Sequence, residues 1–451
     1  MMNLIIPING IKGEIMKKSL FLVVLLVFVM FFAFAQAEKE ASSGPVTLEW
    51  WTWDADLKDI NAKIIADFEA QNPNVTINNT IISTTEYWTK IKIQSQQNKL
   101  PDVFCMSSGY LEEWASLDLL YNLDSLIEGD ESIKNFYPTL LDGGKEISGG
   151  QHYFAIPFAL VTTPLFFNKD YFDAANLEYP NSDWTWDDFT KAAKKLTVDK
   201  DGDGKTDQYG FWFYGRYAHI EPWIYANDGN LINRETMLFE PDANAINALK
   251  MLVNMVVIDH SAPMPQEMSA LRQQDVFPNG IAAMWVDGSW NIDNNRLTAP
   301  DTMNWGISMV PGGPDTQTPK VYGWNDFYAI AKNTKNPEMS WKFAKYVAGE
   351  GLTMDNYMAG KIPTYIPLTE SEAFEDTSKL PIEISVLKDQ AGSPMRTSFT
   401  KGWSEWRGYG AAESLGFNGY IDAVLNGTMT FDAAMAECPE VLNKVFMRYY
   451  Q

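Results

Sequence analysis

The chain has 451 residues, more than one hydrophobic core usually holds, so two or more lobes are expected. Its formal net charge of −23 opposes binding to nucleic acids and anionic membranes and disfavours polyanionic ligands. The charge excludes nothing about neutral ligands, and 16 Trp, 20 Tyr and 25 Phe offer many flat aromatic surfaces.

Residues 1–37 have the pattern of a secretory signal peptide. Two lysines follow Met16, an unbroken apolar run fills 20–34, and Ala35-Gln36-Ala37 forms an A-x-A cleavage site. The residues before Met16 look like an over-called gene start. The apolar run is short for a membrane-spanning helix, so we expect cleavage and a periplasmic protein, with an uncleaved anchor as the alternative. Cleavage removes three lysines and one glutamate, which leaves a net charge of −25.

Strands and helices alternate through the first part of the mature chain. Apolar residues recur at every second position in the strands and at three- and four-residue spacing in the helices. This alternation predicts an α/β fold with a parallel sheet, whose ligands lie beyond the carboxyl ends of the strands. The predicted elements are strands at 46–51, 75–81 and 100–106 and helices at 57–71, 86–97 and 111–127.

Two further stretches predict packing roles for tryptophan. "SDWTWDDF" at 182–189 is typical of a helix start, with Asp183 or Thr185 as the cap and both tryptophans packed inward. Trp341, in "MSWKFAKYV", lies at helical spacing from Ala344 and is expected in the core.

Six stretches resemble, in the same order, segments of the extracellular solute-binding proteins (family 1) of sugar ABC importers. They include "LEWWTWDADLKDINAKIIADFEAQNPNVTI", "KLPDVFCMSSGYLEEWASLDLLYNLDSLI", "NGIAAMWVDGSWNI" and "GWNDFYAIAKNTKNPEMSWKFAKYV". The chain is thus similar to maltose- and oligosaccharide-binding proteins. Each motif alone is weak, but together they cover almost the whole mature chain.

The resemblance implies a two-lobed α/β fold of the periplasmic-binding-protein type II. Each lobe would be a sheet flanked by helices, with a ligand cleft between the lobes. The first lobe would comprise 45–160 and 305–365, and the second 161–304 and 366–451. The implied function is to bind a di- or oligosaccharide, by closing a hinge around it, and to deliver it unchanged to the permease of an ABC transporter. A monomer that needs no cofactor is expected.

A sugar has weakly apolar C–H faces, which suit aromatic rings, and a hydroxyl rim, which needs paired donors and acceptors. Several loop positions offer this mixture. The resemblance adds stacking roles for Trp290 and Trp403, whereas Trp324 replaces a glycine that the family often has. For each tryptophan the alternative is core packing, and for each aspartate it is a turn or cap. The candidate ligand-binding residues are Trp53, Asp54, Ser107, Ser108, Tyr110, Trp223, Asp228, Trp290, Trp324, Asn325, Trp403 and Arg407.

The stretch "DKDGDGKTDQYG" at 199–210 matches most of a calcium loop of the EF-hand type. Such a loop needs oxygen ligands at positions 1, 3, 5, 7, 9 and 12 and glycine at position 6. Gly204 occupies position 6, but Gly210 replaces the bidentate glutamate of position 12. A structural Ca²⁺ and a metal-free aspartate–glycine turn both fit, and the following 207–215 is predicted as a strand. The candidate ligands are Asp199, Asp201, Asp203, Lys205 through its carbonyl, and Asp207.

Two other classes share some of these features. A secreted glycoside hydrolase would also be acidic, aromatic and exported, but it needs two carboxylates placed across one bond, which sequence cannot identify among 58 acidic residues. A calcium-dependent adhesion module would rest on the aspartate loop alone. The sequence contains neither G-x-S-x-G nor H-E-x-x-H, and its three histidines are scattered.

Overall fold

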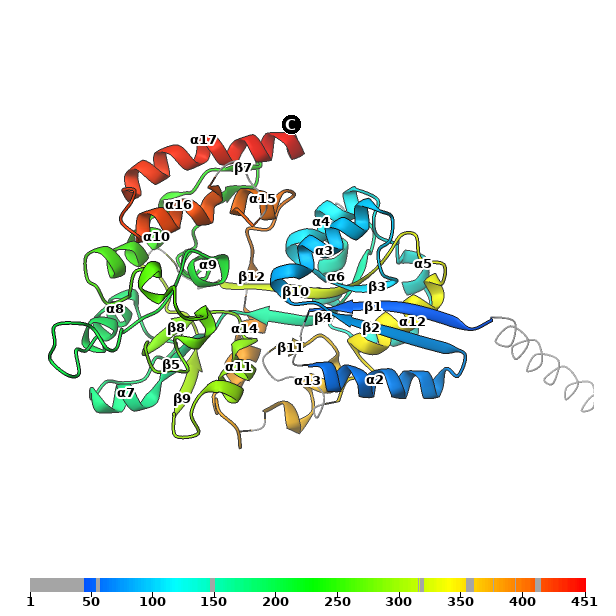
Figure 1. The fold of residues 1–451 in the computed structure, drawn as a ribbon, viewed down its shortest axis with the longest axis horizontal. Coiled ribbons are helices and arrows are strands. Elements are labelled where there is room, and N and C mark those ends of the chain that lie inside the picture. Colours follow the sequence, from blue (N-terminus) through cyan, green and yellow to red (C-terminus); the bar gives the residue numbers. More distant parts are fainter. Residues whose placement is uncertain are drawn as a thin grey trace, which may run out of the picture.

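A computed structural model of the chain describes residues 44–53, 57–146, 151–314, 316, 320–353, 361–375, 377–393, 395–409 and 415–451. Two lobes lie side by side, and each has its own sheet and hydrophobic core (Figure 1). The predicted two-lobed α/β fold is therefore confirmed. Within the described residues, no helix is long and apolar enough to cross a membrane.

The sheet of the first lobe is mixed rather than parallel. Its first three strands pair in parallel as predicted, in the order β2-β1-β3. β10 then runs antiparallel between β3 and β4, and β11 and β12 pair with β4 and β10. The strands are β1 (Val46–Thr52), β2 (Val75–Ile81), β3 (Val103–Ser107), β4 (Ala155–Thr162), β10 (Val321–Ile330), β11 (Ile362–Pro363) and β12 (Met395–Arg396).

Alternation of side chains places one face of β1 in the first core. Leu48 and Trp50 are buried, whereas Thr47 and Glu49 between them are exposed. The Trp50 ring meets Phe343 edge to face at 5.2 Å. The helices around this sheet are α2 (Lys58–Gln71), α3 (Thr84–Gln96), α4 (Ser108–Ser116), α5 (Asp124–Ile127), α6 (Pro138–Glu146) and α12 (Pro337–Ala348).

The helix predicted at 111–127 is two short helices. α4 ends at Ser116 and α5 begins at Asp124. Asp118, between them, has a φ of 55°, which a continuous right-handed helix does not allow. Trp341, on α12, is buried in the first core, as predicted.

The second lobe is mainly helical around a small antiparallel sheet, in the order β8-β5-β9. Its strands are β5 (Leu165–Asn168), β8 (Met284–Val286) and β9 (Trp305–Ser308), with a separate hairpin of β6 (Ile232–Asn233) and β7 (Leu238–Phe239). Its helices are α7 (Lys169–Ala174), α8 (Trp186–Lys195), α9 (Tyr217–Ala226), α10 (Ala243–Val257), α11 (Asn291–Thr298), α15 (Trp403–Arg407), α16 (Gly416–Leu425) and α17 (Phe431–Tyr450). Two more short helices follow β11 in the chain: α13 (Ile366–Thr369) packs on β11, and α14 (Ser385–Gly392) packs on β4 and β11.

The chain passes from the first lobe to the second after the end of β4, and it returns to the first lobe before the start of β10. β4 ends at Thr162 and β5 of the second sheet begins at Leu165. Thr163 donates from Oγ1 to the carbonyl of Tyr322 at 3.0 Å, which ties the first two crossings together. Because 305–308 form β9 of the second sheet, the predicted boundary at 305 is corrected to a position after Ser308. The stretch 207–215, predicted as a strand, makes only isolated bridges, at Gln208, Tyr209 and Trp212.

The predicted start of α8 is confirmed in detail, and it yields a stability prediction. Thr185 is the N-cap, and a reciprocal capping box joins it to Asp188. Thr185→Ala is expected to lower the free energy of unfolding by about 0.5–2 kcal/mol, because it removes the acceptor for the Asp188 amide. Urea unfolding followed by circular dichroism measures the change.

The matched control lies on the same helix. The Thr190 hydroxyl donates to the Trp186 carbonyl at 2.9 Å, a bond that does not cap the helix. Thr190→Ala is therefore expected to change stability less than Thr185→Ala. Equal losses from both substitutions would contradict the capping role.

Candidate functional site

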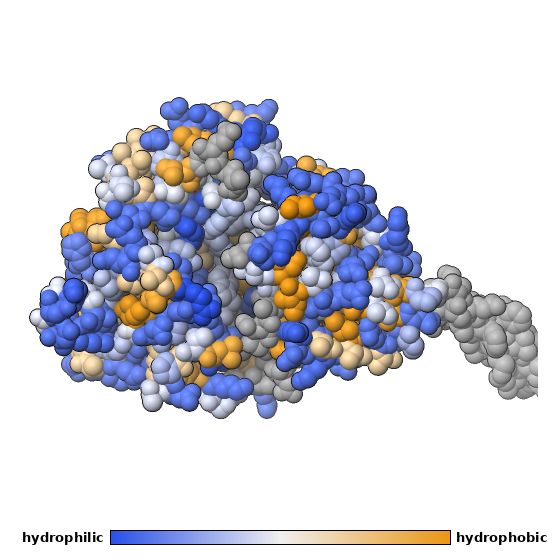
Figure 2. Space-filling model, in the orientation of Figure 1, coloured by the Kyte–Doolittle hydropathy of each residue, from blue (hydrophilic) through white to orange (hydrophobic). Residues whose placement is uncertain are grey.

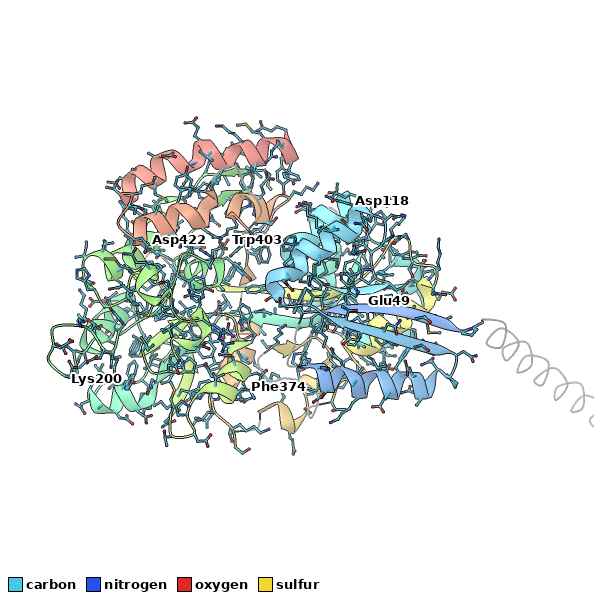
Figure 3. All side chains as sticks on the ribbon, in the orientation of Figure 1. Glu49, Asp118, Lys200, Phe374, Trp403 and Asp422 are labelled. Carbon is cyan, nitrogen blue, oxygen red and sulfur yellow. The ribbon has the colours of Figure 1, made fainter. Side chains whose placement is uncertain are left out.

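A band of aromatic rings lies where the two lobes meet. Figure 2 shows the molecular surface hollowed between the lobes, and Figure 3 labels Trp403, the first residue of α15, on the side of the second lobe that faces the first. We call this group of rings the aromatic seam. Its members are Tyr110, Tyr217, Trp290, Trp324, Phe399, Trp403 and Tyr409.

Tyr217, at the first turn of α9, is the centre of the seam. Its ring meets Trp324 at 5.3 Å and Trp403 at 5.1 Å, both edge to face. Trp290 lies 5.7 Å from Trp324. Tyr110 of the first lobe meets Trp403 of the second at 5.9 Å, so the seam joins both lobes through ring contacts.

The rings differ in how much surface they present. Trp324 and Trp403 are buried, at 6% and 5% exposure, whereas Tyr409 is 40% exposed. Trp290 and Tyr217 are half-buried. Other rings therefore cover most of the surface of Trp324 and Trp403 in this structure.

Local structure fixes two of the tryptophans. Trp324 is on β10, where side chains alternate, so it faces the seam while Asn325 turns to the first lobe and donates from Nδ2 to the Leu140 carbonyl at 3.1 Å. Trp290 follows β8 at the N-cap of α11 and folds back over Gly288. A Cβ at Gly288 would lie 1.9 Å from the Trp290 ring, so only glycine allows this approach.

Two buried carboxylates lie near the seam. Asp287 accepts from its neighbour Gly288 N at 2.7 Å and from Asn291 Nδ2 at 2.8 Å, and His219 Nε2 lies 3.5 Å from it. Asp326, two residues after Trp324, pairs with Lys361 at 3.2 Å. Carboxylates are hydrogen-bond acceptors of the kind that a polyhydroxylated ligand needs.

Burial raises the pKa of the tyrosine hydroxyls of the seam, which are neutral at physiological pH. It raises the pKa of Tyr217 well above its ordinary value, and the nearby Tyr409, Asp287 and Asp326 act in the same direction. Burial raises the pKa of Tyr110 in the same way. Neutral phenols both donate and accept hydrogen bonds, as hydroxyl recognition requires.

Three of the sequence candidates lie elsewhere. Trp223 is fully buried between Phe189 and Phe211 in the second core, and Arg407 is fully buried too, paired with Glu221. Asp228 lies just beyond the C-terminal end of α9, whereas Tyr217 is at the N-terminal end. Asp228 pairs with Lys320, which directly precedes β10. Trp223 and Arg407 are thus core residues in this structure, away from the junction of the lobes. Asp228 joins α9 to a crossing of the chain, and its contact with ligand stays a prediction.

The first-lobe candidates lie in one region. Ser107 pairs with Asp326 across β3 and β10, and Ser108 donates from Oγ to the Asn325 carbonyl at 2.8 Å. Trp53 is buried behind Trp88 at 5.8 Å. Asp54 lies outside the described residues.

Trp88 is one of the residues that sequence reasoning missed, and it stacks on Tyr110 at 3.6 Å. Tyr217 was also missed, because its partners Trp324 and Trp403 are distant in the chain, and so was Phe399, although it precedes its partner Trp403 by only four residues. Tyr409 lies six residues after Trp403, and Asp287 lies three residues before Trp290. Proximity to a predicted stacking tryptophan was the one available signal for these two residues.

Comparison with known proteins identifies the family. The family model described as bacterial extracellular solute-binding protein matches residues 46–354, and the chain belongs to this family. A putative binding protein of Brucella abortus (strain 2308) is 24% identical over 332 residues, covering 70% of this chain and 76% of that protein. The multiple sugar-binding protein of Streptococcus mutans serotype c is 22% identical over 316 residues, covering 68% and 72%.

A solved structure agrees with the fold. The ABC substrate-binding protein of Listeria monocytogenes, in complex with cycloalternan, superposes with a TM-score of 0.75 at 24% identity, covering 88% of this chain and 98% of that one. This similarity supports the two-lobed architecture, with its long crossing strands, seen here.

The aspartate loop lies far from the seam, at the outer end of the second lobe, where Figure 3 labels Lys200. Carboxylate oxygens of Asp199, Asp201 and Asp207 lie within 4.8 Å of one another and could hold a cation. Asp203 instead accepts from the backbone amide and the side chain of Lys205, at 2.8 and 3.2 Å. A structural Ca²⁺ at this loop stays a prediction.

Calorimetric titration tests that prediction. Extracellular calcium modules bind with Kd of about 10⁻⁴–10⁻³ M, so 10 mM Ca²⁺ is expected to stabilise the protein by about 1.4–2.7 kcal/mol. Asp199→Ala is expected to abolish the effect, because it removes the oxygen ligand at the first position of the loop. Absence of heat and of any Ca²⁺-dependent rise in Tm in the unmodified protein would show that the loop is a metal-free turn.

Proposed function

We propose that this protein binds an oligosaccharide between its two lobes and delivers it unchanged to the permease of an ABC transporter. It acts in the periplasm after its signal peptide is removed, as a monomer. The observation that carries the proposal is the aromatic seam. Tyr217, Trp324 and Trp403 bring flat rings from separate segments to the junction of the lobes.

The chemistry of the seam favours a neutral carbohydrate. Aromatic faces match the C–H faces of pyranose rings, while Asp287, Asp326 and the phenols supply acceptors and donors for hydroxyls. Each neutral hydrogen bond contributes roughly 0.5–1.5 kcal/mol, so several rings and polar groups must act together. The number of rings in the seam favours more than one sugar unit over a monosaccharide.

The relatives support the same class of ligand. The S. mutans protein is named for binding multiple sugars, and the L. monocytogenes protein was solved with cycloalternan. These proteins are binders rather than hydrolases, in line with a ligand that leaves unaltered. The family description, extracellular solute-binding protein, supports the exported location.

Tryptophan fluorescence against a sugar panel tests the proposal. Maltose, maltotriose, mannotriose, acarbose and glycerol 3-phosphate serve as probes, and product analysis runs in parallel. At least one neutral oligosaccharide is expected to shift the emission saturably, without any new reducing ends. The phosphate ester is expected to give no shift, because the net charge opposes anions.

A pair of variants locates the site. Trp324→Ala is expected to weaken binding by roughly tenfold or more, in the range of a lost hot-spot residue. Trp341→Ala removes a buried tryptophan of the first core and is expected to lower stability more than affinity. Release of reducing ends by the unmodified protein, or binding that Trp324→Ala leaves unchanged, would contradict the proposal.

A further inference from the structure

A buried polar node lies behind the aromatic seam. Arg407 and Glu221 are both fully buried and form an ion pair between Nη2 and Oε1. Ser398, 1% exposed, donates from Oγ to the same Glu221 oxygen at 2.8 Å. The second terminal nitrogen of Arg407 donates to Asn418 Oδ1 at 3.2 Å. The node thus joins α9, α15, α16 and the segment before α15.

Each member of the node is a close neighbour of a seam ring in the chain. Glu221 lies four residues after Tyr217 on α9, and Arg407 lies four residues after Trp403 on α15. Side chains four residues apart lie on one side of a helix, so their relative positions are fixed by helix geometry. Ser398 directly precedes Phe399. Fixing the node therefore fixes three seam rings relative to one another.

The helix that carries Trp403 cannot hold its own orientation. α15 has only five residues, far fewer than an independently stable helix needs, and it has no side-chain N-cap. Besides the ion pair of Arg407, a buried hydrogen bond holds α15: Trp406 donates from Nε1 to Thr400 Oγ1 at 3.0 Å. Contacts of this kind must set the direction in which the Trp403 ring points.

A buried ion pair is a poor source of stability, because the cost of desolvating both charges offsets most of their attraction. The surroundings here are apolar: the Arg407 guanidinium lies 5.0 Å from the Trp406 ring and 5.3 Å from Phe417. Apolar side chains of similar size would fill the same space. Hydrogen-bonded charges differ from apolar side chains because their contacts are directional. Each hydrogen bond fixes the orientation of the segment that it joins.

We propose that Glu221, Arg407 and Ser398 form a positioning node that holds Tyr217, Phe399 and Trp403 in the orientation that grips the sugar. This inference rests on the proposed function for its effect on affinity. None of the three node residues touches the ligand; they act through the rings in front of them.

The test replaces the pair by apolar residues of similar size. Glu221→Leu/Arg407→Met is expected to keep its urea midpoint close to that of the unmodified protein, since such exchanges are often neutral. Affinity for maltotriose, or for whichever panel sugar binds most tightly, is expected to fall by roughly tenfold, because the rings lose their preorganised orientation. The near-ultraviolet circular dichroism of the ligand-free protein, which reports ring orientation, is expected to change.

The control is an ion pair between a buried lysine and a partly buried glutamate. Lys169 and Glu383 pair at 2.6 Å, with side chains 6% and 29% exposed, and neither contacts a seam ring. Lys169→Met/Glu383→Leu is expected to leave both the sugar affinity and the near-ultraviolet circular dichroism spectrum unchanged. If the node variant folds and also leaves both unchanged, the inference is overturned.

Two further outcomes are decisive. If the double variant does not fold, Ser398→Ala takes its place. The loss of one hydrogen bond is expected to lower the sugar affinity roughly threefold. Unchanged affinity of Ser398→Ala would overturn the inference. If the unmodified protein binds no sugar, the proposed function fails by itself. The near-ultraviolet circular dichroism of the ligand-free node variant then tests the positioning role. A spectrum equal to that of the unmodified protein overturns the inference.

Discussion

The structure depends on edge-to-face packing of aromatic rings at the junction of two lobes. Tyr217 lies between Trp324, on a strand of the first lobe, and Trp403, on a short helix of the second. β4 and β10 bring both lobes to this junction, and two residues separate the sheet of one lobe from the sheet of the other. Any relative motion of the lobes must therefore change the ring contacts of the seam. The rings that we propose to contact the ligand are thus the same rings that join the two lobes.

Surface charge and aromatic rings act on different classes of ligand. The strong negative charge is spread over the surface, where it keeps anions away, while the carboxylates near the seam are buried and held by specific partners. Desolvation raises the pKa of Tyr217 and Tyr110, so these seam hydroxyls are neutral over an even wider pH range than ordinary tyrosines. The site combines apolar faces with uncharged hydroxyls and a few fixed acceptors, a combination that suits a carbohydrate better than an ion.

Much of the fold was predictable from the sequence, because it rests on local signals. Alternation in β1 and helical spacing in α2 identified both elements, and the ordered motifs implied two lobes. The antiparallel insertion of β10 was not predictable from alternation, since its pairing depends on strands more than 150 residues away in the chain. The break between α4 and α5 depends on one left-handed residue, Asp118, that carries no strong signal.

The site was predictable only in part, for a related reason. Trp290, Trp324 and Trp403 follow strands or lie in short aromatic segments, and all three join the seam. Trp223 lies in an equally aromatic segment but faces the second core, because helix phase decides which side of α9 a residue takes, whereas Arg407 lies on the same side of α15 as Trp403, buried behind it. In a helix of five residues that phase cannot be read from spacing. Tyr217 escaped notice because its importance comes from partners 107 and 186 residues away.

A crystal structure of the protein with a bound oligosaccharide tests the central claim most directly. The account predicts the sugar between the lobes, with pyranose faces in van der Waals contact, about 4 Å, with seam rings such as Trp290 and Trp324. It also predicts at least one sugar hydroxyl bonded to Asp287 or Asp326. A sugar bound on the outer surface of either lobe, or between lobes without touching the seam, would contradict the account.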